Sequence, residues 1–151
     1  MEADSRLAGR SALVTGSGRG IGAAIARTYA GAGAAVLIAD RNAKTATATA
    51  DALRQAGAAA EPFVGDVANP DDCQGMVDHC IDAFGGIDIL VNNAGIAFHS
   101  LFVDTTLEDW ERVLRINLTG PLLIGQAAAQ HMMEHGGGRI INIGSTSGQR
   151  G

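Results

Sequence analysis

The chain reads ALVTGSGRGIG over residues 12–22, and this stretch decides the fold. Three apolar residues, 12–14, predict a short buried strand, and residues 21–32 have the composition of a helix. The turn between them is rich in glycine, which lets a backbone come close to a phosphate group. The first turn of a helix offers unpaired N–H groups to such an anion. No Gly-Lys-Ser/Thr follows, so the turn is not a Walker A loop.

The alternation of strand and helix continues along the chain. Strands are expected at residues 35–39, 60–64, 87–91 and 139–143, and helices at 45–55, 70–84 and 107–134. Pro62 suits an edge strand, and Gly120-Pro121 predict a local kink inside the longest helix. Strands joined by helices predict an α/β fold, a doubly wound parallel sheet of the Rossmann type, in one domain over residues 1–151.

Composition and charge exclude several classes of protein. Apolar residues make up 46% of the 151 residues and charged residues 18%, as in a globular domain. The net charge is −5 with scattered basic residues, so neither nucleic acid nor an anionic membrane is expected as a partner. The longest apolar stretches are too short to span a bilayer, and residues 1–10 lack the apolar centre of a signal peptide. A cytoplasmic location is therefore expected.

Neither the cysteines nor the histidines predict a metal site. Cys73 and Cys80 lie seven residues apart in an expected helix, a rise of about 10 Å, which is too far for a disulfide. We expect them to be buried or half-buried free thiols. His131 and His135 match the H-x-x-E-H pattern of a zinc protease, but they precede three glycines, so we interpret them as the end of a helix.

Asp40 closes the second expected strand, 18 residues after Gly22. In a dinucleotide-binding fold, an acid at this place accepts hydrogen bonds from the adenosine ribose hydroxyls and repels a 2′-phosphate. NAD is therefore the expected cofactor. NADP is the less favoured alternative, because Arg19 and Arg41 could bind a 2′-phosphate.

Further polar residues follow the other strands in a recognisable order. The chain has TGSGRGIG at residues 15–22, Asp40, Asp66-Val67 after the third strand, NNAG at 92–95, Asn117 in the long helix and INIGS at 141–145. With these motifs the chain resembles the short-chain dehydrogenase/reductase family along nearly its whole length. The family's sheet has the strand order 3-2-1-4-5, with the ligand at the carboxyl ends of the strands.

The resemblance implies a role for each matching residue. The cofactor's diphosphate would lie over the opening turn, its adenosine ribose beside the end of the second strand, its adenine at Asp66 and Val67, and its other ribose near Asn93. Ser145 would bind the substrate's oxygen, and Asn117 would hold a water of the proton relay through its backbone. The implied cofactor-binding residues are Gly16, Ser17, Gly18, Arg19, Gly20, Ile21, Gly22, Asp40, Arg41, Asp66, Val67 and Asn93. Asn92 and Asn93 could instead be turn formers, and Ser145 an ordinary loop serine.

The implied activity is hydride transfer between a nicotinamide cofactor and an alcohol or carbonyl substrate, in a homo-oligomer. Family chemistry also needs a Tyr-x-x-x-Lys pair, but the only Tyr is Tyr29 and the only Lys is Lys44. We therefore expect a domain truncated after the fifth strand, incomplete at its C-terminal side and inactive alone, with an apolar edge at residues 139–143 that favours aggregation. The alternative is a non-catalytic dinucleotide-binding or oligomerisation module.

Overall fold

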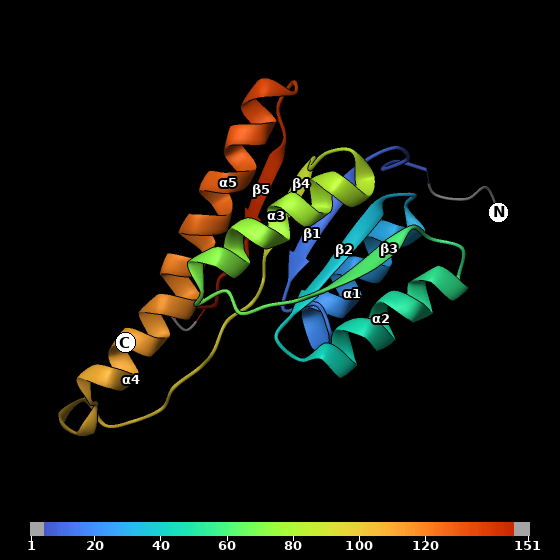
Figure 1. Cartoon of the computed structure of the whole chain (residues 1–151). Coiled ribbons are helices and arrows are strands. Elements are labelled where there is room, and N and C mark those ends of the chain that lie inside the picture. The colour runs from blue at the N-terminus through green and yellow to red at the C-terminus, as the bar shows by residue number, and fades with distance from the viewer. Residues whose placement is uncertain (1–4, 147–151) are drawn as a thin grey trace.

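A computed structural model describes residues 5–146; residues 1–4 and 147–151, which include the chain end at Gly151, lie outside the described part. Strands and helices alternate along it (Figure 1). They are β1 (Ser11–Thr15), α1 (Gly20–Gly31), β2 (Ala35–Asp40), α2 (Ala43–Gln55), β3 (Ala60–Val64), α3 (Pro70–Phe84), β4 (Ile89–Asn92), a 3-10 turn (Phe102–Asp104), α4 (Leu107–Leu114), a π-helical turn (Arg115–Thr119), α5 (Gly120–Glu134) and β5 (Arg139–Asn142).

The strands form one parallel sheet in the order β3-β2-β1-β4-β5. The doubly wound α/β fold and the strand order expected from the family resemblance are therefore confirmed. The order reverses between β1 and β4, because the chain first adds strands on one side of β1 and then on the other. Loops that leave the carboxyl ends of these two strands diverge, and ligands of such sheets bind in the crevice between them.

Helices cover both faces of the sheet, α1 and α2 on one face and α3 and α5 on the other (Figure 1). Alternation along β1 fits this arrangement, since successive side chains of a strand point to opposite faces. Ala12 and Val14 pack in the core beneath α1 and α2, whereas Leu13 packs in the core beneath α3 and α5. All five residues of β1 are buried, as in a strand covered on both sides.

The helix boundaries depart from the sequence prediction where local capping or proline intervenes. Helix α2 begins at Ala43, two residues earlier than expected, because the side chain of Asn42 accepts a hydrogen bond from the Thr45 N–H at 3.2 Å. The expected irregularity of the long helix is present as the π-helical turn Arg115–Thr119. Pro121 has no N–H to donate to the carbonyl of Asn117, four residues earlier, which disfavours regular α-helical bonding there.

The two edges of the sheet differ. Strand β3, which contains Pro62, lies at one edge as predicted. At the other edge all four residues of β5 are exposed, and Ile140 and Ile141 keep 41% and 39% of their surface accessible. The expected apolar edge is therefore present in the described residues, while aggregation of the chain remains a prediction.

Both cysteines are buried free thiols, as predicted. Burial raises the pKa of Cys73 to about 11 and that of Cys80 to about 12, so both stay protonated at neutral pH. The rings of His131 and His135 stack 3.9 Å apart at the end of α5. Within residues 5–146, no group of three or more His, Cys, Asp or Glu side chains could hold a metal ion, and no helix is long and apolar enough to cross a membrane.

Asp88 connects the amino ends of β1 and β4. Its carboxylate accepts hydrogen bonds from the Ser11 N–H at 2.9 Å and from Arg10 at 2.7 Å. Burial raises the pKa of Asp88, but the hydrogen bonds from Ser11 and Arg10 together outweigh it and hold the pKa below its usual value. The ionised form is therefore stabilised by folding. This contribution is fully present above the unfolded pKa of about 4 and is lost as the pH falls through the folded value.

Replacing Asp88 with Asn should lower the free energy of unfolding at pH 7 by about 1.5 kcal/mol, the lower end of the usual contribution of a hydrogen bond to a charged group. The loss should shrink as the pH falls below about 4, because the wild-type carboxylate is then protonated too. Urea unfolding at a series of pH values measures both effects. Asp82→Asn, at an exposed position of α3, is the control, and an equal pH dependence of the two variants would contradict the assignment.

Candidate functional site

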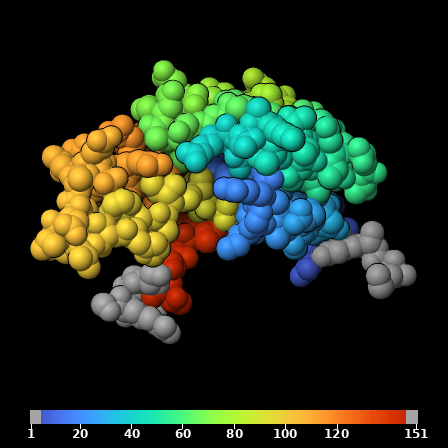
Figure 2. All heavy atoms as spheres, turned by 90° about the horizontal axis from the view of Figure 1, so that it is seen from below, coloured from blue at the N-terminus to red at the C-terminus, as the bar shows by residue number. Residues whose placement is uncertain are grey.

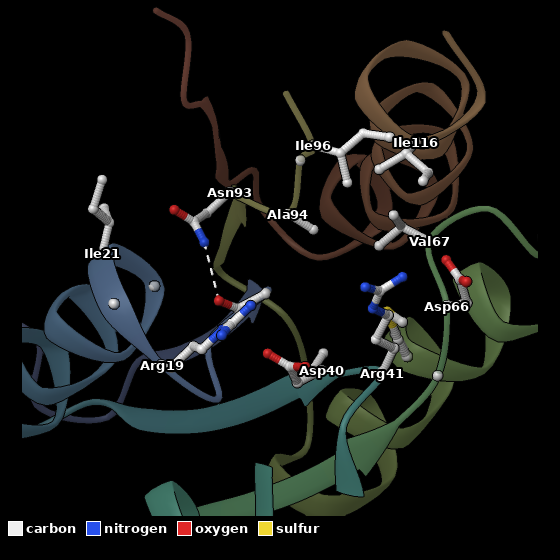
Figure 3. Close-up of a pocket in the computed structure, with 17 residues that line it drawn as sticks. Arg19, Ile21, Asp40, Arg41, Asp66, Val67, Asn93, Ala94, Ile96 and Ile116 are labelled. Atoms are coloured by element: carbon white, nitrogen blue, oxygen red, sulfur yellow. Dashed lines mark hydrogen bonds between the residues drawn. The ribbon is translucent and has the colours of Figure 1, made fainter. Parts of the chain in front are cut away.

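A cleft of about 470 Å³ opens at the carboxyl ends of the strands, where the strand order reverses (Figure 3). These ends face the viewer in Figure 2. The loops after β1, β2, β3 and β4 all contribute to its walls, together with α3 and the π-helical turn. The residues that line it are Gly16, Arg19, Gly20, Ile21, Gly22, Ala39, Asp40, Arg41, Gly65, Asp66, Val67, Met76, Asn93, Ala94, Gly95, Ile96 and Ile116.

The opening turn packs so closely that two of its glycines are required. Gly16 has φ +62°, and a Cβ there would lie 2.9 Å from the Cα of Ala94. A Cβ on Gly22 would overlap with the carbonyl oxygen of Gly16, so only glycine allows α1 to start beneath the turn. The turn thus brings the first residues of α1 to the wall of the cleft.

Not every residue predicted in this turn reaches the cleft. Ser17 is completely buried, and its hydroxyl donates to the Val14 carbonyl at 2.6 Å. Gly18 donates its N–H to the Asp40 carboxylate at 2.9 Å. Neither residue lines the cleft, whereas the five others predicted in the turn, Gly16, Arg19, Gly20, Ile21 and Gly22, do. Ser17 and Gly18 therefore stabilise the conformation of the turn and do not line the cleft.

The N-terminal end of α1 can receive an anion. Its N-cap residue, Arg19, makes no side-chain capping bond, and the first turn of the helix contains no acidic residue. The first N–H groups of a helix have no acceptor within the helix, and they carry its partial positive charge. A Cβ on Gly20 would meet nothing within 4 Å, so the helix start faces open space.

The Asp40 carboxylate is held at the end of β2 by main-chain donors. One oxygen accepts from Gly18, and the other accepts from the Asn42 N–H at 3.0 Å. Each carboxylate oxygen keeps further acceptor capacity, so the group can bind additional hydroxyls without losing these bonds. Arg19 and Arg41 line the cleft on either side of Asp40 in the view of Figure 3.

The loop after β3 presents Asp66 and Val67 to the cleft. The Asp66 N–H donates to the carboxylate of Asp72 at 2.8 Å, and the Asp66 carboxylate accepts from the Ala68 N–H at 2.9 Å. Val67 is 7% exposed, and it lies near Ile96 and Ile116 at one side of the cleft (Figure 3). This side therefore combines an apolar wall with a fixed carboxylate.

Thr15 and Asn93 join the loops that diverge from β1 and β4. The Thr15 hydroxyl accepts from the N–H groups of Asn93 at 3.1 Å and Ala94 at 3.0 Å. The Asn93 side-chain amide donates to the carbonyls of Thr15 at 2.9 Å and Gly16 at 3.2 Å, the latter drawn in Figure 3. Sequence reasoning did not assign this role to Thr15. A hydroxyl at the end of an otherwise apolar buried strand was the available signal.

The two residues predicted to take part in catalysis do not line the cleft themselves. Asn117 pairs with the main chain of Ile96, accepting from its N–H at 2.9 Å and donating to its carbonyl at 2.8 Å. It thereby ties the loop after β4 to the π-helical turn. Ser145 lies exposed beyond β5. The apolar lining residues Met76, Ile96 and Ile116 were not predicted, because nothing in the sequence separates them from ordinary core residues.

Comparison with known proteins gives consistent matches. The model of the short chain dehydrogenase family matches residues 10–151. A sorbitol dehydrogenase of Cereibacter sphaeroides is 45% identical over 147 residues, 97% of this chain and 56% of the relative. A D-threitol dehydrogenase of Mycolicibacterium smegmatis is 44% identical over 142 residues, 94% of this chain and 55% of the relative. The chain thus spans about half the length of the curated relatives it matches.

A solved structure shows the same backbone. A 7α-hydroxysteroid dehydrogenase, in complex with NADH and 7-oxo glycochenodeoxycholic acid, superimposes with a TM-score of 0.94 at 35% sequence identity. The match covers 100% of this chain and 59% of that chain. The arrangement of strands and loops around the cleft is therefore shared with that protein.

Replacing Thr15 with Val should destabilise the fold by about 1–3 kcal/mol, because two main-chain N–H groups at the junction of β1 and β4 lose their acceptor. Thr15→Ser keeps the hydroxyl and is the matched control. Thermal unfolding of both variants measures the difference. Equal melting temperatures for the two would show that the Thr15 hydroxyl does not hold the loops together.

Proposed function

The chain belongs to the short-chain dehydrogenase family, and on this basis we propose that its cleft binds a nicotinamide dinucleotide and that the whole protein transfers hydride between this cofactor and an alcohol or carbonyl substrate. One observation carries the proposal. At the point where the strand order reverses, an open helix start and the fixed carboxylate of Asp40 line the same cleft.

The residues of the cleft fit the charged part of such a cofactor. A diphosphate needs unpaired donors and close approach of the main chain. The start of α1 supplies both, since its first N–H groups lack helical acceptors and Gly20 leaves the space before them open. Arg19 adds a positive charge at the same wall.

Asp40 supports NAD in preference to NADP. Its carboxylate is fixed by two main-chain N–H groups and can still accept bonds from the two ribose hydroxyls. A 2′-phosphate would meet this negative charge. Arg19 and Arg41 favour the opposite choice, which keeps NADP as the alternative.

The remaining residues fit the two ends of the cofactor. Asp66 and Val67 would bind the adenine edge, and Asn93 with the small residues after it would lie along the second ribose. When bound, a nicotinamide cofactor would provide the hydride chemistry, as donor or acceptor. Asn117 keeps a carbonyl without its ordinary helical donor, because Pro121 has no N–H, and this carbonyl could hold a water for proton transfer. Ser145 would hydrogen-bond the substrate oxygen.

We propose oxidation of a polyol as the first reaction to test. Two relatives, with identities of 45% and 44%, are named for sorbitol and D-threitol. A preference for NAD fits oxidation of an alcohol. The exposed apolar side chains of α4, Leu107 at 70% and Trp110 at 56%, support a homo-oligomer in which this helix is covered. A cytoplasmic location stays a prediction.

Replacing Asp40 with Asn should raise the Kd of NADH about tenfold, the factor that corresponds to about 1.4 kcal/mol, and should leave or improve the Kd of NADPH. The cause is loss of the charge that binds the ribose diol and repels a 2′-phosphate. NADH and NADPH fluorescence titrations measure both constants. Asp66→Asn is the matched control, because a change at the adenine edge should weaken both cofactors equally. Tighter NADPH than NADH binding by the wild type would refute the NAD assignment.

The purified 151-residue chain should bind NADH but show no measurable oxidation of sorbitol or threitol. Its Tyr29 and Lys44 lie on α1 and α2 and do not line the cleft, so no phenol is placed to take the hydroxyl proton. Following NADH formation by absorbance tests this expectation. Turnover by the purified chain at rates of about 1 per second or more, within the usual range for enzymes, would contradict it.

A further inference from the structure

Gly120 has no conformational reason to be glycine. It starts α5 with φ −56° and ψ −55°, which any residue adopts in a helix. Glycine within a helix costs about 1 kcal/mol relative to alanine. The cause must therefore lie in the packing around this residue.

The packing allows no side chain at this position. A Cβ on Gly120 would lie 2.6 Å from the carbonyl oxygen of Val67 and 3.1 Å from its Cβ. The buried start of α5 thus rests directly on the main chain of the loop between β3 and α3. The same loop presents Asp66 and Val67 to the cleft.

The loop between β3 and α3 is also held by contacts with α3, so it cannot easily move away from Gly120. The Val67 carbonyl accepts a hydrogen bond from the Cys73 thiol at 3.2 Å. Burial raises the pKa of this thiol to about 11, which keeps its proton available at neutral pH. The Asp66 N–H donates to Asp72, and the Asp66 carbonyl accepts from the Asn69 N–H at 2.9 Å.

We propose that Gly120 and Cys73 are positioning residues for the adenine end of the bound dinucleotide. They fix the Val67 carbonyl from two helices, and so fix the Val67 side chain and the Asp66 carboxylate at the wall of the cleft. The inference rests on the proposed cofactor site. On this proposal, the missing side chain of Gly120 and the thiol of Cys73 serve ligand binding and not the fold alone.

Gly120→Ala tests the contact from α5. The added methyl group should displace the Val67 loop, because protein interiors tolerate little added volume. We expect the Kd of AMP, measured by calorimetry, to rise about tenfold, the factor that corresponds to about 1.4 kcal/mol. The Kd of reduced nicotinamide mononucleotide, followed by its fluorescence, should stay within about twofold. Gly125→Ala is the matched control, because a Cβ at this position of the same helix meets nothing within 4 Å.

Cys73→Ala tests the contact from α3 and remains informative if Gly120→Ala does not fold. It should raise the Kd of AMP severalfold. Without any ligand, it should also speed hydrogen exchange of the Ala68 amide, which is bonded to Asp66. Cys80→Ala is the control. Cys80 is buried on the same helix, but its thiol lies 3.6 Å from the Gly86 carbonyl, and neither residue lines the cleft.

The outcomes separate the two proposals. Wild-type protein that binds neither AMP nor NADH would refute the proposed function, and this inference with it. Wild-type binding with no difference between Gly120→Ala and Gly125→Ala, or between the two cysteine variants, would refute the inference alone. Equal weakening of AMP and the nicotinamide mononucleotide would also overturn it, since that pattern indicates a general distortion.

Discussion

The cleft depends on the hydrogen bonds between Thr15 and Asn93. The wall of the cleft is interrupted where the strand order reverses, because the loops from β1 and β4 lead to opposite faces of the sheet. Four hydrogen bonds close this gap. The Thr15 hydroxyl accepts from the N–H groups of Asn93 and Ala94, and the Asn93 side-chain amide donates to the carbonyls of Thr15 and Gly16. The opening turn is thereby fixed relative to β4, and the start of α1 keeps a fixed position at the wall of the cleft.

The surrounding contacts fix two further parts of the cleft. Asp40 is fixed through Gly18 and Asn42, and the loop after β4 is fixed through the pairing of Asn117 with Ile96. The side chains of Asp40, Asp66 and Asn93 therefore use part of their hydrogen-bonding capacity within the protein itself. Such an arrangement limits the freedom that a ligand must remove on binding, which improves affinity without additional contacts.

The fold could be predicted from the sequence because its signals are local. Apolar runs such as those of β1 and β2, which alternate with helices along the chain, predict a parallel sheet together with the glycine-rich turn between β1 and α1. The strand order needed the resemblance to a family, because periodicity carries no information about neighbours in a sheet. The sequence could place Asp40 at the cleft because an acid at the end of the second strand of such a sheet has a specific expected position, while its role toward a ribose stays a prediction. The site was not predicted where the meaning of a residue depends on distant contacts: Thr15 resembles any strand residue, Ile116 any core residue, and Gly120 any weak point in a helix.

The two edges of the sheet differ in how readily another strand can pair with them. Pro62 removes a main-chain donor from β3 and Glu61 adds a charge, two features that discourage another strand from pairing there. Strand β5 carries two isoleucines and no proline, and its single charged residue, Arg139, lies at its start. Any strand that joins this sheet, whether from the same polypeptide or from another molecule, should therefore extend it beyond β5, on the side away from the adenosine half of the proposed ligand.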